Sequence, residues 1–171
     1  MTSKIRSLLE LGESVTRDIE AIQGSLKNGD YVQSLARCEE VLRRDRLCVP
    51  ALIAVASIIQ LSDDEYPPDL ELDDARVALE TASMVESLGG SSDHELGRFL
   101  FAVADESGPA LDVIDRGIER RERELLELTV ARVEVLVDLG REDEAAVELD
   151  RAKVRFPNSH DLLTALRLGH S

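Results

Sequence analysis

The residues best suited to metal binding or nucleophilic chemistry are few and scattered in this sequence. Its histidines are His94, His160 and His170, and its cysteines are Cys38 and Cys48. A zinc site needs Cys and His at short ligand spacings, such as a Cys-x-x-Cys pair. Neither cysteine lies in such a pair or beside a histidine. We therefore expect no metal site and interpret all five residues as structural.

Carboxylates are abundant, so adjacent pairs such as Asp63-Asp64 and Asp73-Asp74 say little about acid–base chemistry. They fit helix starts and solvated loops better. Residues 62–74 lack the Gly and Asp spacing of a calcium-binding loop. No glycine-rich phosphate-binding motif is present, and Gly89-Gly90 reads as a helix terminator. We expect no catalytic residue and no cofactor, and predict that the protein is not an enzyme.

The composition is typical of helices packed through aliphatic side chains. Aromatic residues make up 3% of the chain, and tryptophan is absent. The formal net charge of -15 argues against nucleic acid and anionic membranes as partners, because such binding depends on Lys and Arg. The charge has two interpretations, which are solubility and attraction of a partner protein with basic character.

Targeting and membrane segments are not expected. The first residues, MTSKIRSLLELGESV, carry charge too early for a signal-peptide core. No apolar run reaches the roughly 18 residues that a membrane span requires. Two thiols do not make a secreted disulfide scaffold. We expect a cytoplasmic protein.

An internal repeat is the main organising feature of the chain. Residues 29–46 align without a gap with residues 140–157, and both segments open with Gly and an acidic residue. Small or apolar residues then recur on one helical face. Two weaker copies lie between these segments. The stripe consists of Ser34, Cys38 and Val41; Ala78, Ala82 and Val85; Ala110, Ile114 and Gly117; and Ala145, Leu149 and Ala152.

Another apolar helix precedes each of these four, so the repeating unit is a helix pair. The earlier helices carry Val15, Ile19, Ile22 and Leu26; Leu52, Val55, Ala56 and Ile59; Leu96, Phe99, Leu100 and Val103; and Val130, Val133, Leu136 and Val137. Gly29, Gly108 and Gly140 mark turns that need positive φ or a tight approach. Pro50 and Pro109 fit first helical turns.

The ends of the array and one insertion complete the organisation. The stretch 3–11 is predicted to run on as a helix into the first repeat, with a bend near Gly12. The stretch 159–168 is predicted to be a capping helix over the last pair, because a terminal repeat otherwise exposes an apolar face. The acidic insertion 62–73 contains Pro67-Pro68 and is predicted to be a loop. It has two interpretations, a solvated connector or a docking hook anchored by Tyr66.

Helix pairs of about 34 residues with this stripe resemble the tetratricopeptide repeat (TPR). The last unit resembles it most, with Gly140, Ala145, Leu149, Ala152 and Pro157 at the turn, small, large, small and proline places of the pattern. The first helices of the second and third units also match, through residues 52–59 and through Leu96-Gly97 with Leu100. Departures include Arg132 in place of the usual leucine, Asp18 in place of the large opening residue, and Arg46 and Glu122 where proline would fall.

The resemblance implies an all-α, right-handed α-solenoid of about four helix hairpins with N- and C-terminal capping helices. The expected domain is 1–171, with repeats at 15–48, 49–90, 91–124 and 125–158. First helices of this family line a concave groove that binds peptides, helices or partner domains. The residues expected on that inner face are Ile53, Ser57, Gln60, His94, Arg98, Phe101, Glu127, Val130 and Glu134. Phe101 and Ile53 are its apolar anchors, although packing between repeats is an equal interpretation for both.

Two binding hypotheses follow. In the first, the protein is an adaptor or chaperone-like module that binds a partner peptide or helix in the groove; bacterial secretion chaperones built from about three such repeats are comparable in size. In the second, the array self-associates into a structural homo-oligomer. The sequence names neither the partner, the pathway nor the organism.

Overall fold

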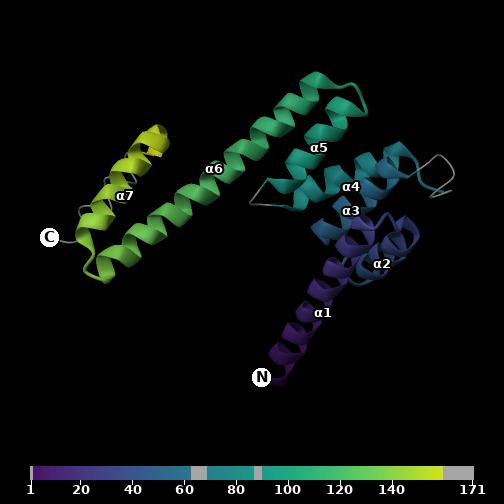
Figure 1. The fold of residues 1–171 in the computed structure, drawn as a ribbon, viewed down its shortest axis with the longest axis horizontal. Helices are drawn as coiled ribbons and strands as arrows, with labels where there is room; N and C mark the ends of the chain where they lie inside the picture. Colours follow the sequence, from purple (N-terminus) through teal and green to yellow (C-terminus); the bar gives the residue numbers. More distant parts are fainter. Residues whose placement is uncertain (1, 63–68, 87–89, 160–171) are drawn as a thin grey trace. The chain divides into compact units, whose positions relative to one another are not determined.

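The computed structural model describes residues 2–62, 69–86 and 90–159, with side chains from residue 14 onward. All regular structure in these ranges is helical, which confirms the all-α prediction (Figure 1). The helices are α1 (Thr2–Lys27), α2 (Tyr31–Arg44), α3 (Val49–Leu61), α4 (Leu72–Val85), α5 (Ser91–Ala102), α6 (Ser107–Asp138), α7 (Glu142–Arg155) and the short 3₁₀ helix η1 (Pro157–Ser159). The chain divides into two compact units, residues 1–117 and 118–171, and α6 contributes to both.

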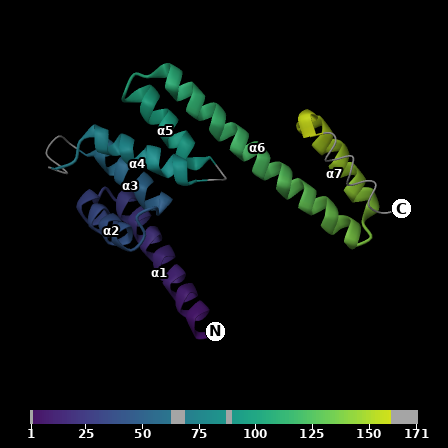
Figure 2. The same cartoon turned by 180° about the vertical axis from the view of Figure 1, so that it is seen from behind.

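In the first unit, helices pack in sequence order. Each helix from α1 to α4 contacts the next one along the chain, and α3 also contacts α1 and α5. Figure 2 shows α3 between α2 and α4. The contacts of α1 with α2 and of α3 with α4 agree with the helix pairs that the sequence pattern predicts.

Helix α3 occupies the centre of the first unit because its sequence, VPALIAVASIIQL, contains no charged residue. A helix without a charged face packs into a core over most of its surface, and the exposed residues of α3 lie near its ends, at Pro50, Gln60 and Leu61. Ala51, Ala54 and Ile58 pack with Ile22, Leu35, Cys38 and Val41 of α1 and α2. Leu52, Ala56 and Ile59 pack on the other side with residues of α4, α5 and α6. The two cores of the unit therefore meet in this helix.

The small-residue stripe predicted for the second helices is buried with few exceptions. Its buried members are Ser34, Cys38 and Val41 on α2; Ala78 and Ala82 on α4; Ala110 and Gly117 on α6; and Ala145, Leu149 and Ala152 on α7. Val85 is exposed and Ile114 is half-buried. Small side chains allow helices to approach closely: a Cβ placed on Gly97 of α5 would lie 2.5 Å from Cγ1 of Ile114 on α6.

Helix starts agree with their local sequence. The Asp30 carboxylate accepts a hydrogen bond from the backbone N–H of Gln33 at 3.0 Å, which caps α2. Pro50 lies in the first turn of α3, where its missing N–H costs little. The backbone N–H of Glu71 donates to the Asp74 carboxylate at 2.8 Å, so the acidic pair Asp73-Asp74 belongs to a helix start.

In its described residues, 118–159, the second unit contains the C-terminal part of α6, then α7 and η1. Its core contains Val133 and Leu136 from α6 with Ala145, Leu149 and Ala152 from α7, closed by Phe156. Leu125, Leu126, Val130 and Val137 pack against this core. These residues form one α6/α7 hairpin with a single apolar seam.

The expected boundary between the third and fourth helix pairs, near residue 124, is absent from the structure. Helix α6 continues from Ser107 to Asp138 without a turn. The segment IERRERELLELTV at 118–130 contains neither glycine nor proline and is rich in strong helix formers, so nothing local ends the helix. Likewise, α1 is one continuous helix through Gly12, and the stretch 3–11 does run into the first repeat.

The structure corrects one of the three predicted turn glycines. Gly29 and Gly140 have positive φ angles of 73° and 68°, as their turn positions require. Gly108 lies in the first turn of α6 without positive φ, and a Cβ added there would have no neighbour within 4 Å. Asp105 takes the left-handed conformation at this turn, with φ of 56°. Aspartate tolerates that conformation better than most residues, so the chain turns there without glycine.

Several sequence predictions lie wholly or partly outside the described residues. The capping helix at 159–168 is one, since only its first residue, Ser159, is described. The docking hook at Tyr66 is another. At the edges of the insertion 62–73, Ser62 follows α3 and its hydroxyl donates to the Ile58 carbonyl, while Leu72 and Asp73 already belong to α4. The loop is therefore shorter at its C-terminal edge than predicted.

Replacing Gly24 with alanine should raise the free energy of unfolding by about 0.5–1 kcal/mol. Gly24 lies inside α1, and a Cβ there has nothing within 4 Å, so the gain in helix propensity meets no steric cost. Urea denaturation followed by far-UV circular dichroism measures the change. Gly97→Ala is the matched control, because its Cβ would collide with Ile114. Equal stabilisation by both substitutions would contradict this packing argument.

Candidate protein-interaction surface

The nine residues predicted for the inner face fall on three helices. Three lie on α3, three on α5 and three on the part of α6 that belongs to the second unit. The structure brings the first two sets together in one unit, where α3 and α5 are in contact. The third set belongs to the other unit, so the prediction of one groove that includes all nine stays a prediction.

On α3, the predicted residues are engaged with their own helix. Ile53 is half-buried and packs against the core shared by α3, α4 and α5. The Ser57 hydroxyl donates to the Ile53 carbonyl at 2.9 Å, and the Gln60 amide donates to the Ala56 carbonyl at 3.0 Å. Ile53, one of the two predicted anchors, therefore contributes mainly to packing in the core of the first unit.

On α5, all three predicted residues are exposed. His94, Arg98 and Phe101 follow each other at i, i+4 and i+7, which places them on one face of the helix. Glu95 lies between the first two: its carboxylate is 3.2 Å from Nδ1 of His94 and 3.9 Å from a guanidinium nitrogen of Arg98. This face combines an aromatic ring with charged groups of both signs.

Phe101 differs from the other phenylalanines of the chain. Phe99 and Phe156 are 3% and 8% exposed, whereas Phe101 is 64% exposed. Val103, close to it along the chain, is also exposed. A large aromatic side chain in solvent has an unfavourable hydration free energy that a partner surface would relieve. Phe101 is thus the clearest candidate anchor on this unit.

On α6, the predicted residues have mixed environments. Val130 packs against the core of the second unit, and Glu127 and Glu134 are exposed. Two carboxylates around a half-buried valine make this a solvated acidic face. It offers no apolar anchor of its own.

A buried ionic cluster joins α4, α5 and α6 in the first unit, and sequence reasoning missed it. Asp93 is fully buried in the first turn of α5. The Ser83 hydroxyl donates to its carboxylate at 2.6 Å, and the Arg116 guanidinium donates to the same oxygen at 2.8 and 3.1 Å. Arg116 also donates to the Ser83 oxygen at 2.8 Å. A carboxylate bound in this way orients three helices and has no access to substrate.

The backbone is tightly packed around this cluster. A Cβ on Gly117 would lie 2.9 Å from the Cβ of Asp93, and a Cβ on Gly90 would lie 2.5 Å from the carbonyl oxygen of Gly117. Glu86 reaches the same turn, where its carboxylate accepts a hydrogen bond from the backbone N–H of Ser92 at 2.8 Å. Only glycine fits at these two contacts, so α5 and α6 approach here at backbone distance.

Neither cysteine is placed for nucleophilic chemistry. Cys38 and Cys48 are both free thiols within the core shared by α1, α2 and α3. Burial raises the pKa of the Cys38 thiol to about 12, with a smaller contribution from Cys48. Because the thiolate is the reactive form, this thiol is inert at neutral pH. Across residues 14–62, 69–86 and 90–159, no three His, Cys, Asp or Glu side chains gather closely enough to hold a metal ion.

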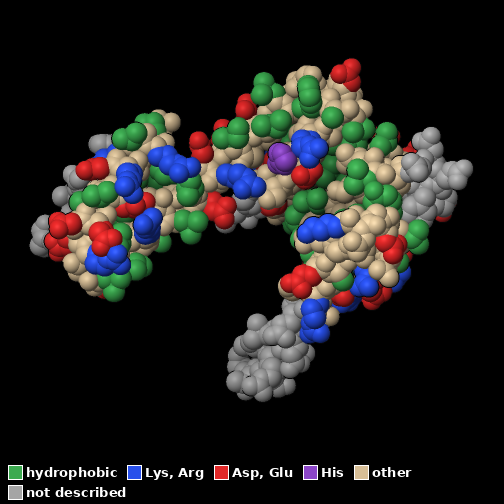
Figure 3. All heavy atoms as spheres, viewed as in Figure 1, with side chains coloured by type: hydrophobic (Ala, Val, Ile, Leu, Met, Phe, Trp, Pro, Cys, Tyr) green, Lys and Arg blue, Asp and Glu red, His purple; other side chains and the backbone are tan. Residues whose placement is uncertain are grey.

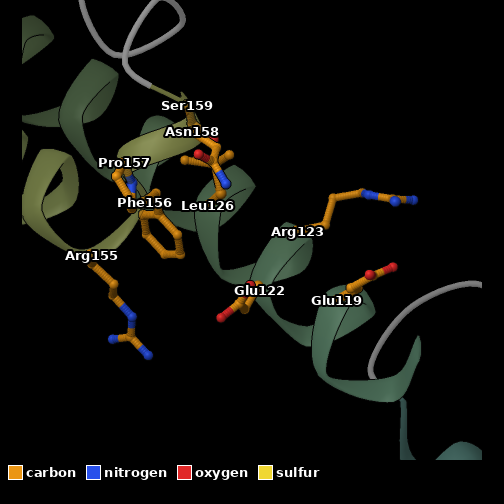
Figure 4. Close-up of a pocket in the computed structure, with 9 residues that line it drawn as sticks. All are labelled: Glu119, Glu122, Arg123, Leu126, Arg155, Phe156, Pro157, Asn158 and Ser159. Carbon is orange, nitrogen blue, oxygen red and sulfur yellow. The ribbon is translucent and has the colours of Figure 1, made fainter. Parts of the chain in front are cut away.

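The second unit carries two hollows that share Phe156. One, of about 550 Å³, is lined from α6 by Glu119, Glu122, Arg123 and Leu126 and from the end of α7 by Arg155 to Ser159 (Figure 4). In Figure 4 the Phe156 ring points from the end of α7 toward α6. The other hollow, of about 360 Å³, is lined by Leu125, Leu128, Thr129 and Arg132 of α6 and by Glu148, Arg151, Ala152, Arg155 and Phe156.

The two hollows differ in charge. The larger has two glutamates and two arginines in its lining. The smaller has three arginines and a single glutamate, Glu148. Figure 3 shows basic side chains interspersed with acidic and apolar ones over α7 and the adjacent part of α6. A cationic hollow on a chain of net charge -15 is a local reversal of the overall charge.

No family model, curated protein or solved structure matches this chain.

A membrane-spanning helix must match the dimensions of a bilayer. Within the described ranges, no helix is both long enough and apolar enough to cross one.

Proposed function

We propose that this protein is an interaction module, an adaptor or chaperone-like protein that binds a segment of a partner protein and catalyses no reaction. In this proposal the helix pairs form a TPR-like, right-handed array whose first helices line a concave face. The partner contacts that face, with Phe101 as the central anchor. The predicted cytoplasmic location is part of the same proposal.

The exposed face of α5 carries this proposal. Binding energy at protein interfaces concentrates in a few aromatic and arginine residues. Arg98 and Phe101 place one of each type within two helical turns, beside His94, and all three are exposed. Glu95 holds the two basic side chains near each other. The face is thus suited to a segment that presents an apolar side chain beside polar groups.

Replacing Phe101 with glutamate should remove partner proteins recovered from the native cell by the tagged chain. Loss of a central aromatic anchor typically costs about 2 kcal/mol or more of binding free energy, which is roughly 30-fold in affinity. Quantitative mass spectrometry of the recovered proteins measures the effect. Stability should change little, because the side chain is exposed.

The matched control for this experiment is Val32→Glu. Val32 is an exposed apolar residue of α2 in the same unit, and the substitution adds the same charge. Partners lost from both variants would indicate a general charge effect. Partners retained by Phe101→Glu would show that the α5 face is not the binding surface.

Self-association is the second candidate function, and exposed apolar residues of α4 favour it. Val77 and Met84 are exposed and lie seven residues apart on one face of this helix. A second copy that covered this face would bury both. A homo-oligomer that persists on dilution in sedimentation experiments, and that Met84→Glu dissociates, would favour this candidate over a monomeric adaptor.

A further inference from the structure

The arginine-lined hollow of the second unit is distinct from the predicted inner face. It lies between α6 and α7 and has a volume of about 360 Å³. Its lining contains no residue of the predicted set. Buried Ala152 and Phe156 and half-buried Leu125 supply apolar surface, and Arg132, Arg151 and Arg155 supply positive charge.

The charge in this hollow is only partly balanced. Glu148 is the single carboxylate in the lining, and its side chain is 17% exposed. One of its oxygens lies 3.5 Å from Arg132 and 3.9 Å from Arg151. Both guanidinium groups are mostly exposed, and each has five N–H donors in a planar fork. Glu144 also interacts electrostatically with Arg132, but Glu148 is the only carboxylate in the lining, and hydrogen-bond donors of both arginines are left for a further acid.

Arg155 adds a third positive charge next to an aromatic ring. Its guanidinium carbon lies 5.6 Å from the centre of the Phe156 ring. Cation–π contact at this distance orients the guanidinium over the ring. The hollow therefore presents arginines on both of its helices and at its end.

An apolar stripe continues from the hollow along α6. Leu128 and Val135 of α6, and Leu139 directly after the helix, are all exposed at i, i+7 and i+11, with Arg132 at i+4. Eleven residues of helix correspond to about 16 Å. That length matches about three turns of a helical ligand.

We propose that this hollow and stripe bind a short acidic, leucine-rich segment of a partner protein, with its carboxylates on Arg132 and Arg151 and its leucines along Leu128 and Val135. Charge complementarity decides between possible occupants. The chain as a whole carries -15, so it repels strongly acidic polymers such as nucleic acid. A segment with a few carboxylates and an apolar face gains from the arginines and the stripe together. The inference rests on the proposed function, protein binding, but places the partner chemistry on a different surface.

Fluorescence anisotropy of the chain with a labelled peptide that carries two carboxylates, Ac-LQELLQQLLEQL-NH₂, tests the inference. The peptide in which lysine replaces every glutamate is the charge control. We expect saturable binding of the acidic peptide that weakens as salt is raised, and weaker binding of the lysine peptide despite the negative net charge of the chain. Binding of both peptides with similar affinity would overturn the proposal.

Variants locate the site. The double substitution Arg132→Gln with Arg151→Gln should weaken binding about tenfold, since it removes two charge-assisted contacts and keeps side chains that are long and polar. Arg43→Gln, at an exposed arginine of α2, is the matched control and should leave the affinity unchanged. Leu128→Ser should also weaken binding. Unchanged affinity in the double variant, with its helicity intact by circular dichroism, would overturn the assignment.

Two further outcomes would indicate that something other than a partner segment occupies the hollow. Dimerisation that the double variant abolishes would assign the hollow to a second copy of the chain and overturn the proposal. Binding that occurs only after deletion of residues 160–171 would assign it to the chain's own C-terminal segment, with the same consequence. Phe101→Glu should bind the acidic peptide as the unchanged protein does, so failure of the α5 proposal and failure of this one are distinguishable.

Discussion

Replacing Gly90 with alanine should lower the free energy of unfolding by about 3 kcal/mol, because two costs add at this position. Gly90 has a φ of 61°, and an L-residue in the left-handed region costs about 1–2 kcal/mol. The new Cβ would also lie 2.5 Å from the carbonyl oxygen of Gly117, which is backbone of α6 and cannot rotate away. Relieving such overlap typically costs about 1–3 kcal/mol. Urea denaturation followed by far-UV circular dichroism measures the loss.

Gly29→Ala separates the two costs. Gly29 has a similar φ of 73°, but nothing lies within 4 Å of its Cβ position. Alanine there should lower the free energy of unfolding by about 1–2 kcal/mol from backbone strain alone. The difference between the two variants is the cost of pushing α5 away from α6. Equal losses would mean that the Gly90–Gly117 approach contributes nothing to stability.

The helical repeat could be predicted because burial follows the helical period. Ser34, Cys38 and Val41 recur at spacings that put them on one face, and the structure buries all three. The absence of charged residues from α3 likewise accounts for its central place. Such patterns depend on residues near each other along the chain, so no tertiary information is needed.

The course of α6 could not be predicted from the repeat pattern. A repeat of about 34 residues requires a turn near residue 124, but the local sequence there favours helix at every position. The structure follows the local preference, and α6 runs on to Asp138. At the turn before α6, Asp105 has the positive φ for which glycine is the usual residue. Gly108, which the sequence pattern assigns to this turn, does not have a positive φ.

The two polar features of the structure also had no usable signal in the sequence. Asp93 in a first helical turn resembles an ordinary charge at a helix start, while its partners Ser83 and Arg116 lie 10 and 23 residues away. Arg132 occupies the position at which the tetratricopeptide pattern has leucine. Its part in a positively charged hollow is evident only once the fold places it near Arg151 of α7. Charge clusters built across helices depend on tertiary packing, which a single sequence does not display.

Replacing Phe156 with alanine should cost about 3–5 kcal/mol and unfold the second unit before the first. Phe156 is 8% exposed and is the largest residue in that unit's buried core. It also ends α7, where its backbone N–H donates to the Ala152 carbonyl at 2.8 Å. Among the described residues of this unit there is no other core to compensate for the cavity, and small cores leave little net stability.

Hydrogen exchange resolved along the chain measures this effect. In the Phe156→Ala variant, amides of α7 should exchange much faster, while those of α3 keep their protection, because α3 is buried in two cores of the first unit. Phe101→Ala is the matched control: the same atoms are removed from an exposed position, so the expected change is within about 0.5 kcal/mol. Acceleration of α3 and α7 together in Phe156→Ala would show that the two units unfold as one cooperative structure, coupled through the continuous helix α6.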